Sequence, residues 1–257
     1  MADLILQYDP SSEEMLNVSL GGGPHFLSFR WWTAAHSEAS QPTRQATKKW
    51  KFIRTGGDRV NLKAGRKYDI EIIVQGSSAT LILDGVEIAR EILPFQLSGL
   101  QLGVFCAGPK RIYFRNFRVE SKRPQAFVVM QFNTPEYEAL FNDVISPVCD
   151  EMGLKAYRAD FTYMPGLVVS DITRQIAESR VIIAEVTPVN GNVYYEVGYA
   201  DALKKPVILI TAAEQLPFDV RPYRTVFYQN SIAGKNQVES ILKKYLKNIM
   251  SPQSMPE

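Results

Sequence analysis

The pattern of apolar and polar positions changes its period near the middle of the chain. In the first half, Tyr68–Val74 alternates between apolar and polar residues, as a half-buried strand does. Asp84-Gly85 stands between two further strand-like runs, and this dipeptide is typical of a type I′ hairpin turn. Short strands with turn signals between them predict an antiparallel β-sandwich over residues 1–121. Its clearest predicted strands are 26–33, 68–74, 80–83, 86–89, 100–105 and 111–120.

After Pro124 the pattern predicts strands that alternate with helices. Pro147 should kink or split the first of these helices, because proline has no backbone N–H. Strands joined by helices form a parallel sheet with right-handed crossovers. We therefore predict an α/β domain with a five-stranded parallel sheet over 125–250, and a frayed polar tail over 251–257. The predicted strands are 126–130, 154–158, 181–185, 206–210 and 225–228, and the predicted helices are 134–152, 167–179, 193–203 and 238–249.

Charge is nearly balanced over the whole chain but not along it. The net charge of +2 on 257 residues indicates no nucleic-acid or membrane partner by itself. Between Arg44 and Lys67, however, basic residues are opposed by Asp58 alone. Such a run is either a solvated strand face or a binding site for a polyanion or a phosphorylated signal. The tryptophans of this half allow two interpretations as well, a sugar-stacking platform or packing inside the sandwich. They are Trp31, Trp32 and Trp50.

Several kinds of site and location are not indicated by the sequence. Cys106 and Cys149 lie in different predicted domains, and no Cys/His spacing suggests a metal site. We expect both to be buried thiols in a reducing cytosol. The chain shows neither a signal peptide nor the roughly 18-residue apolar run that a membrane span needs. We therefore expect a cytoplasmic protein with no membrane contact, no metal and no cofactor.

Polar and aromatic side chains follow the ends of neighbouring predicted strands in the α/β domain. The carboxyl ends of parallel strands meet at one edge of the sheet, where open α/β sheets bind their ligands. Glu196 should lie in the first turn of a helix, where the helix dipole and unpaired N–H groups keep a carboxylate ionised. Arg158 is a candidate for binding a phosphate, and the aromatic residues for stacking on a base or ribose. The predicted substrate contacts are Gln131, Phe132, Arg158, Asp160, Asn192, Tyr194 and Tyr195.

Both halves resemble known families. Tyr68–Val119, with the Asp84-Gly85 turn and the run Phe114-Arg-Asn-Phe-Arg-Val119, resembles laminin-G and concanavalin-like jelly rolls. The second half resembles the nucleoside 2-deoxyribosyltransferase-like superfamily and its TIR-like relatives, which implies a flavodoxin-like fold. The segments that carry this second resemblance are Asp171–Thr187, Asn192–Ala200 and Lys204–Ile210, and 217–224 extends it.

The second resemblance implies roles for individual residues. In the deoxyribosyltransferases a glutamate in an E-x-G-x-A run attacks the anomeric carbon, and this role falls on Glu196. Asp171 is nearest to the family's partner for the leaving base. Two positions depart from the family, since Glu185 and Asn190 stand where many relatives have aspartate. TIR-like enzymes also use one glutamate to cleave NAD, so the sequence leaves the base and the sugar open.

The resemblance implies an N-glycosidase whose substrate, not cofactor, is NAD or another nucleotide. TIR-like hydrolases with fused sensing domains resemble effectors of bacterial anti-phage defence, and such domains often act as homo-oligomers. Two alternatives stay open at this point. The α/β domain could hold a nucleotide signal without cleaving it, or both domains could serve only in assembly. In each case the β-sandwich is a candidate module for sensing or assembly, with a carbohydrate or a polyanion as candidate ligand.

Overall fold

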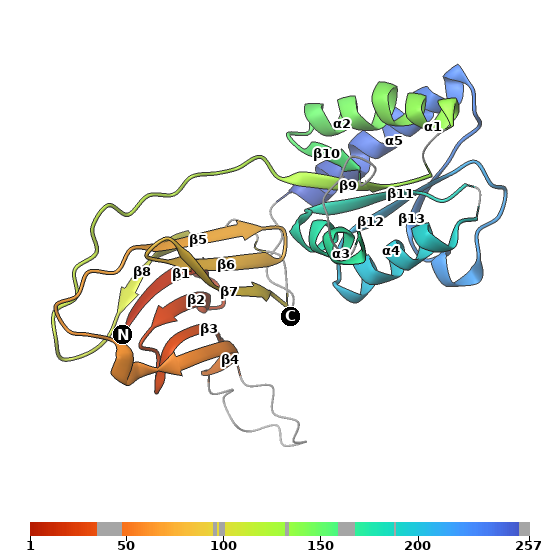
Figure 1. The fold of residues 1–257 in the computed structure, drawn as a ribbon. Coiled ribbons are helices and arrows are strands. Elements are labelled where there is room, and N and C mark those ends of the chain that lie inside the picture. The colour runs from red at the N-terminus through yellow and green to blue at the C-terminus, as the bar shows by residue number, and fades with distance from the viewer. Residues whose placement is uncertain are drawn as a thin grey trace.

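The computed structural model describes residues 1–34, 48–94, 97, 101–131, 134–158, 168–187 and 189–251. Two antiparallel sheets in the first half are followed by a five-stranded parallel sheet with helices on both faces (Figure 1). The sequence predicted both the antiparallel first half and the five-stranded parallel sheet, and these predictions are confirmed. The jelly-roll and flavodoxin-like assignments stay predictions, as does the frayed tail, of which 252–257 lie outside the described residues.

The first half contains one five-stranded sheet, in the order β4-β3-β2-β1-β8, and one three-stranded sheet, β5-β6-β7. Leu16 and Phe29 of the larger sheet share a hydrophobic cluster with Leu81 of the smaller one, so the core lies between the two sheets. The predicted turn at Asp84-Gly85 is present, with φ of 51° and 82°. The elements are β1 Ala2–Asp9, β2 Glu14–Leu20, β3 His25–Ala34, β4 Lys48–Asp58, the 3₁₀ turn η1 Arg59–Asn61, β5 Ile70–Gln75, β6 Ser78–Leu83, β7 Val86–Ile92 and β8 Gln101–Cys106.

The three tryptophans do not form one platform. Trp31 packs against the core between the sheets. Trp32 and Trp50 are paired across β3 and β4, with ring centroids 5.1 Å apart. The Arg30 guanidinium lies 3.9 Å from the Trp50 ring and forms a buried ion pair with Asp3. One tryptophan of the proposed sugar platform is therefore a core residue, and a second is already stacked with a protein cation.

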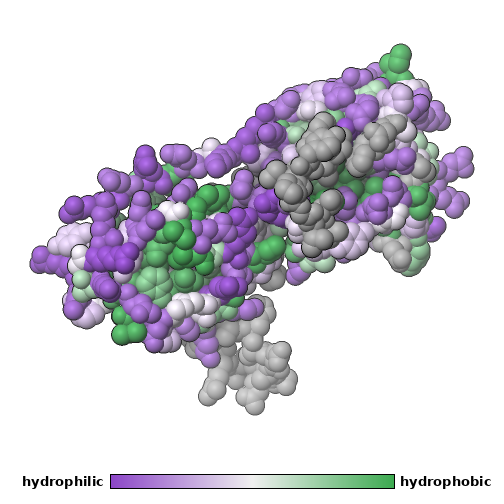
Figure 2. Space-filling view, in the orientation of Figure 1, coloured by the Kyte–Doolittle hydropathy of each residue, from purple (hydrophilic) through white to green (hydrophobic). Residues whose placement is uncertain are grey.

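The predicted strand over 111–120 is not formed. These residues belong to an extended connection from β8 to the parallel sheet, which carries mainly hydrophilic side chains (Figure 2). Tyr113 and Phe117 are 72% and 52% exposed. Apolar alternation shows only that one face of the segment favours burial. A strand also needs a neighbouring strand with which its backbone can form hydrogen bonds. The backbone at Asn116, with φ of 54°, interrupts the extended geometry in the middle of the segment. Cys106, at the end of β8, is exposed rather than buried as expected, whereas Cys149 is buried.

The parallel sheet has the strand order β10-β9-β11-β12-β13. One face packs against α1, α2 and α5, and the other against α3 and α4. The strands are β9 Gln125–Val129, β10 Lys155–Arg158, β11 Val181–Glu185, β12 Val207–Thr211 and β13 Arg224–Phe227. The helices are α1 Pro135–Leu140, η2 Phe141–Ile145, α2 Ser146–Glu151, α3 Val168–Glu178, α4 Gly191–Ala202, the 3₁₀ turn η4 Phe218–Val220 and α5 Ile232–Met250.

Two helices differ from their predicted form for local reasons. The first predicted helix continues past Pro147, but the turn before it is π-helical, which accommodates the missing N–H without a break. The last helix begins at Ile232 rather than 238 because Ser231 Oγ accepts a hydrogen bond from the Gly234 N–H at 3.0 Å. A Cβ at Gly234 would lie 1.9 Å from the Gln229 carbonyl oxygen. Glycine is therefore needed here, because the chain that leads into α5 passes too close for any side chain.

Candidate active site

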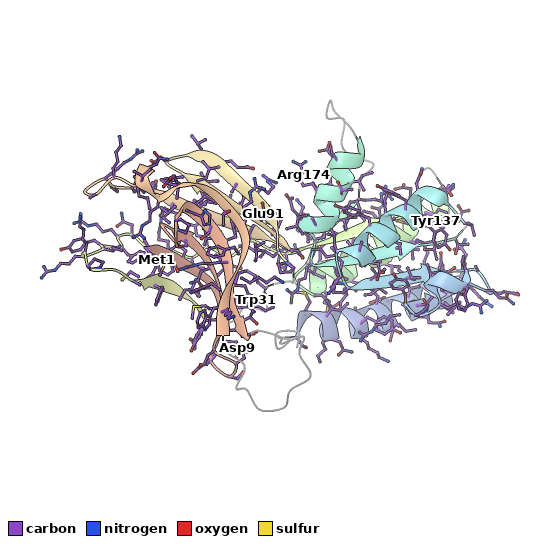
Figure 3. The ribbon with its side chains drawn as sticks, turned by 90° about the horizontal axis from the view of Figure 1, so that it is seen from below. Met1, Asp9, Trp31, Glu91, Tyr137 and Arg174 are labelled. Carbon is purple, nitrogen blue, oxygen red and sulfur yellow. The ribbon has the colours of Figure 1, made fainter. Side chains whose placement is uncertain are left out.

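The strand order reverses at the carboxyl ends of β9 and β11, and we call this edge of the sheet, with the residues that follow the two strands, the crevice. These strands are neighbours, yet the helices after β9 cover one face of the sheet and α3, which leads into β11, covers the other. Such a reversal is where open α/β sheets bind ligands. Gln131 follows β9 at this point and is half-buried, and Glu185 is the last residue of β11. Tyr137, just beyond this edge, lies at the end of the domain that is remote from the β-sandwich (Figure 3).

Glu185 is a buried carboxyl group with one unsatisfied oxygen. Its side chain is 1% exposed, and Oε2 accepts a hydrogen bond from the Thr187 N–H at 3.0 Å. Oε1 has no hydrogen-bond partner within the described part of the chain. Burial raises the pKa of Glu185 to about 7, although the bonds from Thr187 act in the opposite direction. Near neutral pH this group therefore exists in both protonation states.

Three phenols lie close enough to sense the charge of Glu185. They are Tyr137 from α1, Tyr194 from α4 and Tyr228 just after β13, and burial followed by the Glu185 charge raises the pKa of each. The Tyr137 hydroxyl donates to the Thr187 carbonyl oxygen. The Tyr194 hydroxyl is buried and has no partner among the residues described. Glu185 thus ends its strand near three aromatic hydroxyl groups, and that of Tyr194 has no partner among the described residues.

Glu196 lies in the second turn of α4, not in the first turn as predicted. The helix begins at Gly191, and Asn190 is its N-cap, with the side-chain oxygen accepting the Asn192 N–H at 2.9 Å. Without dipole support at the helix end, the effect of burial dominates and raises the pKa of Glu196 to about 7, so the carboxylate is not held ionised. In the described ranges no hydrogen bond or ion pair engages this side chain. Glu196 is therefore a half-buried carboxyl group available to a ligand.

The other predicted substrate residues are placed unevenly. Phe132 and Asp160 lie outside the described residues. Asn192 and Tyr195 are exposed on the first turns of α4, and Tyr195 is 57% exposed. Tyr194 senses the charge of Glu185, but it precedes Glu196 by two positions and therefore points to a different side of α4.

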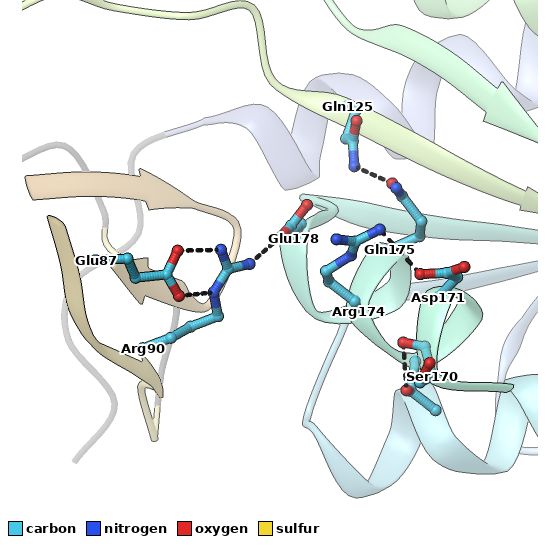
Figure 4. A network of polar contacts seen from close by, with 9 residues as sticks. Glu87, Arg90, Gln125, Ser170, Asp171, Arg174, Gln175 and Glu178 are labelled. Carbon is cyan, nitrogen blue, oxygen red and sulfur yellow. Dashed lines mark hydrogen bonds and ion pairs between the residues drawn. The ribbon is translucent and has the colours of Figure 1, made fainter. Parts of the chain in front are cut away.

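Arg158 and Asp171 are both engaged in ion pairs. Arg158 is 3% exposed, and its Nη2 lies 2.9 Å from a carboxylate oxygen of Glu138. Its guanidinium also lies 4.6 Å from the Phe141 ring. A ligand phosphate at Arg158 would therefore compete with Glu138 for the same cation. Asp171 is in the first turn of α3 and pairs with Arg174 at 3.0 Å (Figure 4).

A groove elsewhere on the domain has the volume of a ligand site. It has about 540 Å³ and runs along the edge strand β13. None of the predicted site residues lines it, so it is a separate feature from the crevice. The described residues contain no group of three or more His, Cys, Asp or Glu that could hold a metal ion. Among them there is also no helix long and apolar enough to cross a membrane. The groove is lined by Glu214, Gln215, Leu216, Arg221, Tyr223, Thr225 and Phe227.

The sequence pattern gives little sign of Glu185 and none of two of its neighbours. Glu185 departs from the family's aspartate, and no motif indicates Tyr137 or Tyr228. One signal was available, since Val181–Glu185 is apolar until its last residue and every position of it is buried. An acid at the end of such a strand must either find a partner or take up a proton.

Comparisons with known proteins give limited likenesses. No family model matches the chain, and no curated protein matches its sequence. Among solved structures, the CMP N-glycosidase BcmB of Clostridium botulinum is 20% identical, with a TM-score of 0.38, over 46% of this chain and 98% of that enzyme. A 2-deoxyribosyltransferase of Bacillus psychrosaccharolyticus is 11% identical, with a TM-score of 0.39, over 51% and 99%. The lysine decarboxylase LdcF of Francisella novicida is 11% identical, with a TM-score of 0.35, over 55% and 18%.

Proposed function

We propose that the α/β domain cleaves the bond between base and sugar in a nucleotide. The observation that supports this most is Glu196, a half-buried carboxyl group beside the crevice with no hydrogen bond or ion pair to any residue that the structure describes. A second buried acid, Glu185, is close to it in sequence. Cleavage of a glycosidic bond needs one carboxylate to meet the electron-poor sugar carbon and one acid to protonate the leaving group. Two carboxyl groups with pKa values of about 7 can divide these states between them near neutral pH.

Glu196 is the nucleophile in this scheme. Its carboxylate oxygen forms a bond to C1′ while the C1′–N bond breaks and its electron pair passes to the base nitrogen. A carboxylic acid of the site gives that nitrogen its proton. Water then attacks C1′ of the glycosyl ester, its proton passes to the acid's conjugate base, and the Glu196 carboxylate is released.

Glu185 is better suited than Asp171 to supply the proton. The Asp171 carboxylate is already paired with the Arg174 guanidinium at 3.0 Å. Burial raises the pKa of Glu185 to about 7, and one of its oxygens has no partner among the described residues. In this scheme the Tyr194 hydroxyl, which also lacks a partner among them, would assist the transfer of the proton to the base.

The substrate class and setting extend the same proposal. NAD or a nucleoside monophosphate would contact Gln131, Asn192, Tyr194 and Tyr195, with Phe132, Arg158 and Asp160 completing the site. The β-sandwich would sense a carbohydrate or a polyanion, and the protein would act as a homo-oligomeric effector of anti-phage defence. These parts rest on the family resemblance of the sequence.

Incubation of the full chain with NAD, CMP and the deoxynucleoside monophosphates tests the activity. Chromatography should detect free base from at least one of them. Calorimetry with the same compounds separates the main alternative, a binding module for a nucleotide signal, which the departures at Glu185 and Asn190 favour. A binder would give heat of binding and return every ligand intact, and that result would overturn the proposed hydrolysis.

A further inference from the structure

Helix α3 connects the two ends of the α/β domain. It begins at Val168, and Asp171 lies in its first turn, at the carboxyl edge of the sheet where the crevice lies. It ends at Glu178, three residues before β11 starts, so its C-terminal end lies at the opposite edge, beside the β-sandwich (Figures 1 and 4). Ile176 of α3 and Val197 of α4 belong to one hydrophobic cluster. A displacement of α3 therefore acts on the helix that carries Glu196.

The last carbonyl groups of α3 are bonded by groups from outside the helix. The final carbonyls of any α-helix lack intrahelical partners. The Ala177 oxygen accepts the Ser77 N–H of the β-sandwich at 2.9 Å and the Lys205 Nζ at 2.5 Å. Lys205 Nζ also donates to the Ser179 oxygen at 2.8 Å and is almost fully buried. The C-cap of α3 is thus made jointly by its own domain and by the neighbouring one.

The turn that approaches α3 requires glycine. Gly76 has a φ of 56°, which favours glycine, and a Cβ there would lie 2.6 Å from backbone atoms of Ala177, Glu178 and Ser179. A side-chain rearrangement could not relieve these clashes, because all three contacted atoms belong to the backbone. The hairpin between β5 and β6 therefore fits directly against the end of α3.

Two arginines connect the domains on either side of this turn. Arg90 of β7 donates two hydrogen bonds to Glu87, at 3.1 and 3.0 Å, and a third to Glu178 of α3 at 3.1 Å (Figure 4). The pair with Glu87 fixes the guanidinium before it reaches across. In the other direction, Arg180 Nη1 donates to the Leu97 carbonyl oxygen at 2.9 Å.

We propose that these contacts, which we call the α3 clamp (Gly76, Ser77, Arg90 and Leu97 with residues 177–180), make the β-sandwich a positioning element for the crevice in the α/β domain. Events at the sandwich reach the crevice by moving or releasing α3, and α3 in turn moves α4. The effect of this coupling on catalysis rests on the proposed function. The coupling itself is a property of the fold and can be measured without any substrate.

The test compares Gly76→Ala with Gly85→Ala by hydrogen exchange in the full chain. Both glycines have positive φ, 56° and 82°, so both variants suffer the same kind of backbone strain, but a Cβ at Gly85 meets nothing within 4 Å. Gly76→Ala should speed amide exchange about tenfold or more at 172–179 and 193–198. Gly85→Ala should leave both segments unchanged. Equal exchange in the two variants, or faster exchange confined to 70–92, would overturn the proposal.

A second pair of variants keeps the test decisive if Gly76→Ala does not fold. Arg90→Gln removes the bond to Glu178, and Arg90→Lys retains a cation for it. Exchange in α3 should rise in Arg90→Gln and return toward the wild-type rate in Arg90→Lys, and equal behaviour would count against the clamp. If the protein releases base, Gly76→Ala and Arg90→Gln should lower kcat by a larger factor than they raise KM. They should also shift the pH profile of kcat. A chain that shows coupled exchange but no base release would retain the clamp and lose the proposed function.

Discussion

Replacing Glu185 with glutamine should stabilise the protein above pH 7 and leave its stability nearly unchanged at pH 5. The folded state raises the pKa of Glu185 from 4.5 to about 7. One pKa unit corresponds to about 1.4 kcal/mol, so ionising this buried carboxyl lowers the free energy of unfolding by about 3 kcal/mol above pH 7. The sign follows because the folded chain retains a proton between pH 4.5 and 7 that the unfolded chain has released. The favourable contribution is complete below pH 4.5 and is lost as the pH rises through 7.

Urea unfolding at pH 5 and pH 8 measures this effect. The glutamine cannot ionise, but its amide needs an acceptor, which costs about 1 kcal/mol at every pH. That cost is the same at both pH values and cancels, so the difference between Glu185→Gln and wild type should be about 2.5 kcal/mol more favourable at pH 8 than at pH 5. Glu214→Gln, at an exposed position, should show no such pH dependence. Equal differences at the two pH values would refute a buried carboxyl with a raised pKa.

The remaining predictions concern activity and two glycines. The pH profile of kcat/KM for base release should be bell-shaped with both limbs near pH 7, because the Glu196 and Glu185 pKa values are both about 7. Glu185→Gln should remove the alkaline limb. A flat profile from pH 5 to 9 would contradict the two-carboxyl scheme. Gly198→Ala should raise the free energy of unfolding by about 1 kcal/mol in urea titrations, because alanine favours a helix and its Cβ would meet open space in α4. A lower free energy of unfolding would contradict the open space around this position. Gly234→Ala should lower it by about 2 kcal/mol or more, because its Cβ would clash with the Gln229 carbonyl, and a neutral result would contradict that packing.

The parts of the fold set by local pattern could be predicted from the sequence. The Asp84-Gly85 turn and the five parallel strands follow from residue types and periods that each segment carries itself. The segment 111–120 could not be assigned correctly, because its alternation says nothing about whether a neighbouring strand exists.

The order of the strands, but not the electrostatics at their ends, follows from the sequence pattern. Alternating strands and helices predict that the residues after β9 and β11 lie at one edge of the sheet, and the two strands are neighbours in the structure. The pKa values of Glu185 and Glu196 depend on burial by residues from distant segments, which no local pattern contains. The same holds for Arg158, whose partner Glu138 lies on a different element from its own strand. Asn190 stands where the family has aspartate, and in the structure it is the N-cap of α4.

The role of Glu196 is tested most directly by single-turnover base release from a substrate that the wild type cleaves. Wild type, Glu196→Gln and Glu214→Gln should be compared at saturating protein. The account predicts a loss of about 10³-fold or more for Glu196→Gln, since the glutamine cannot act as a nucleophile, and an unchanged rate for Glu214→Gln. A Glu196→Gln rate within about threefold of wild type, with Glu214→Gln inactive, would place the chemistry in the groove along β13 and contradict the account.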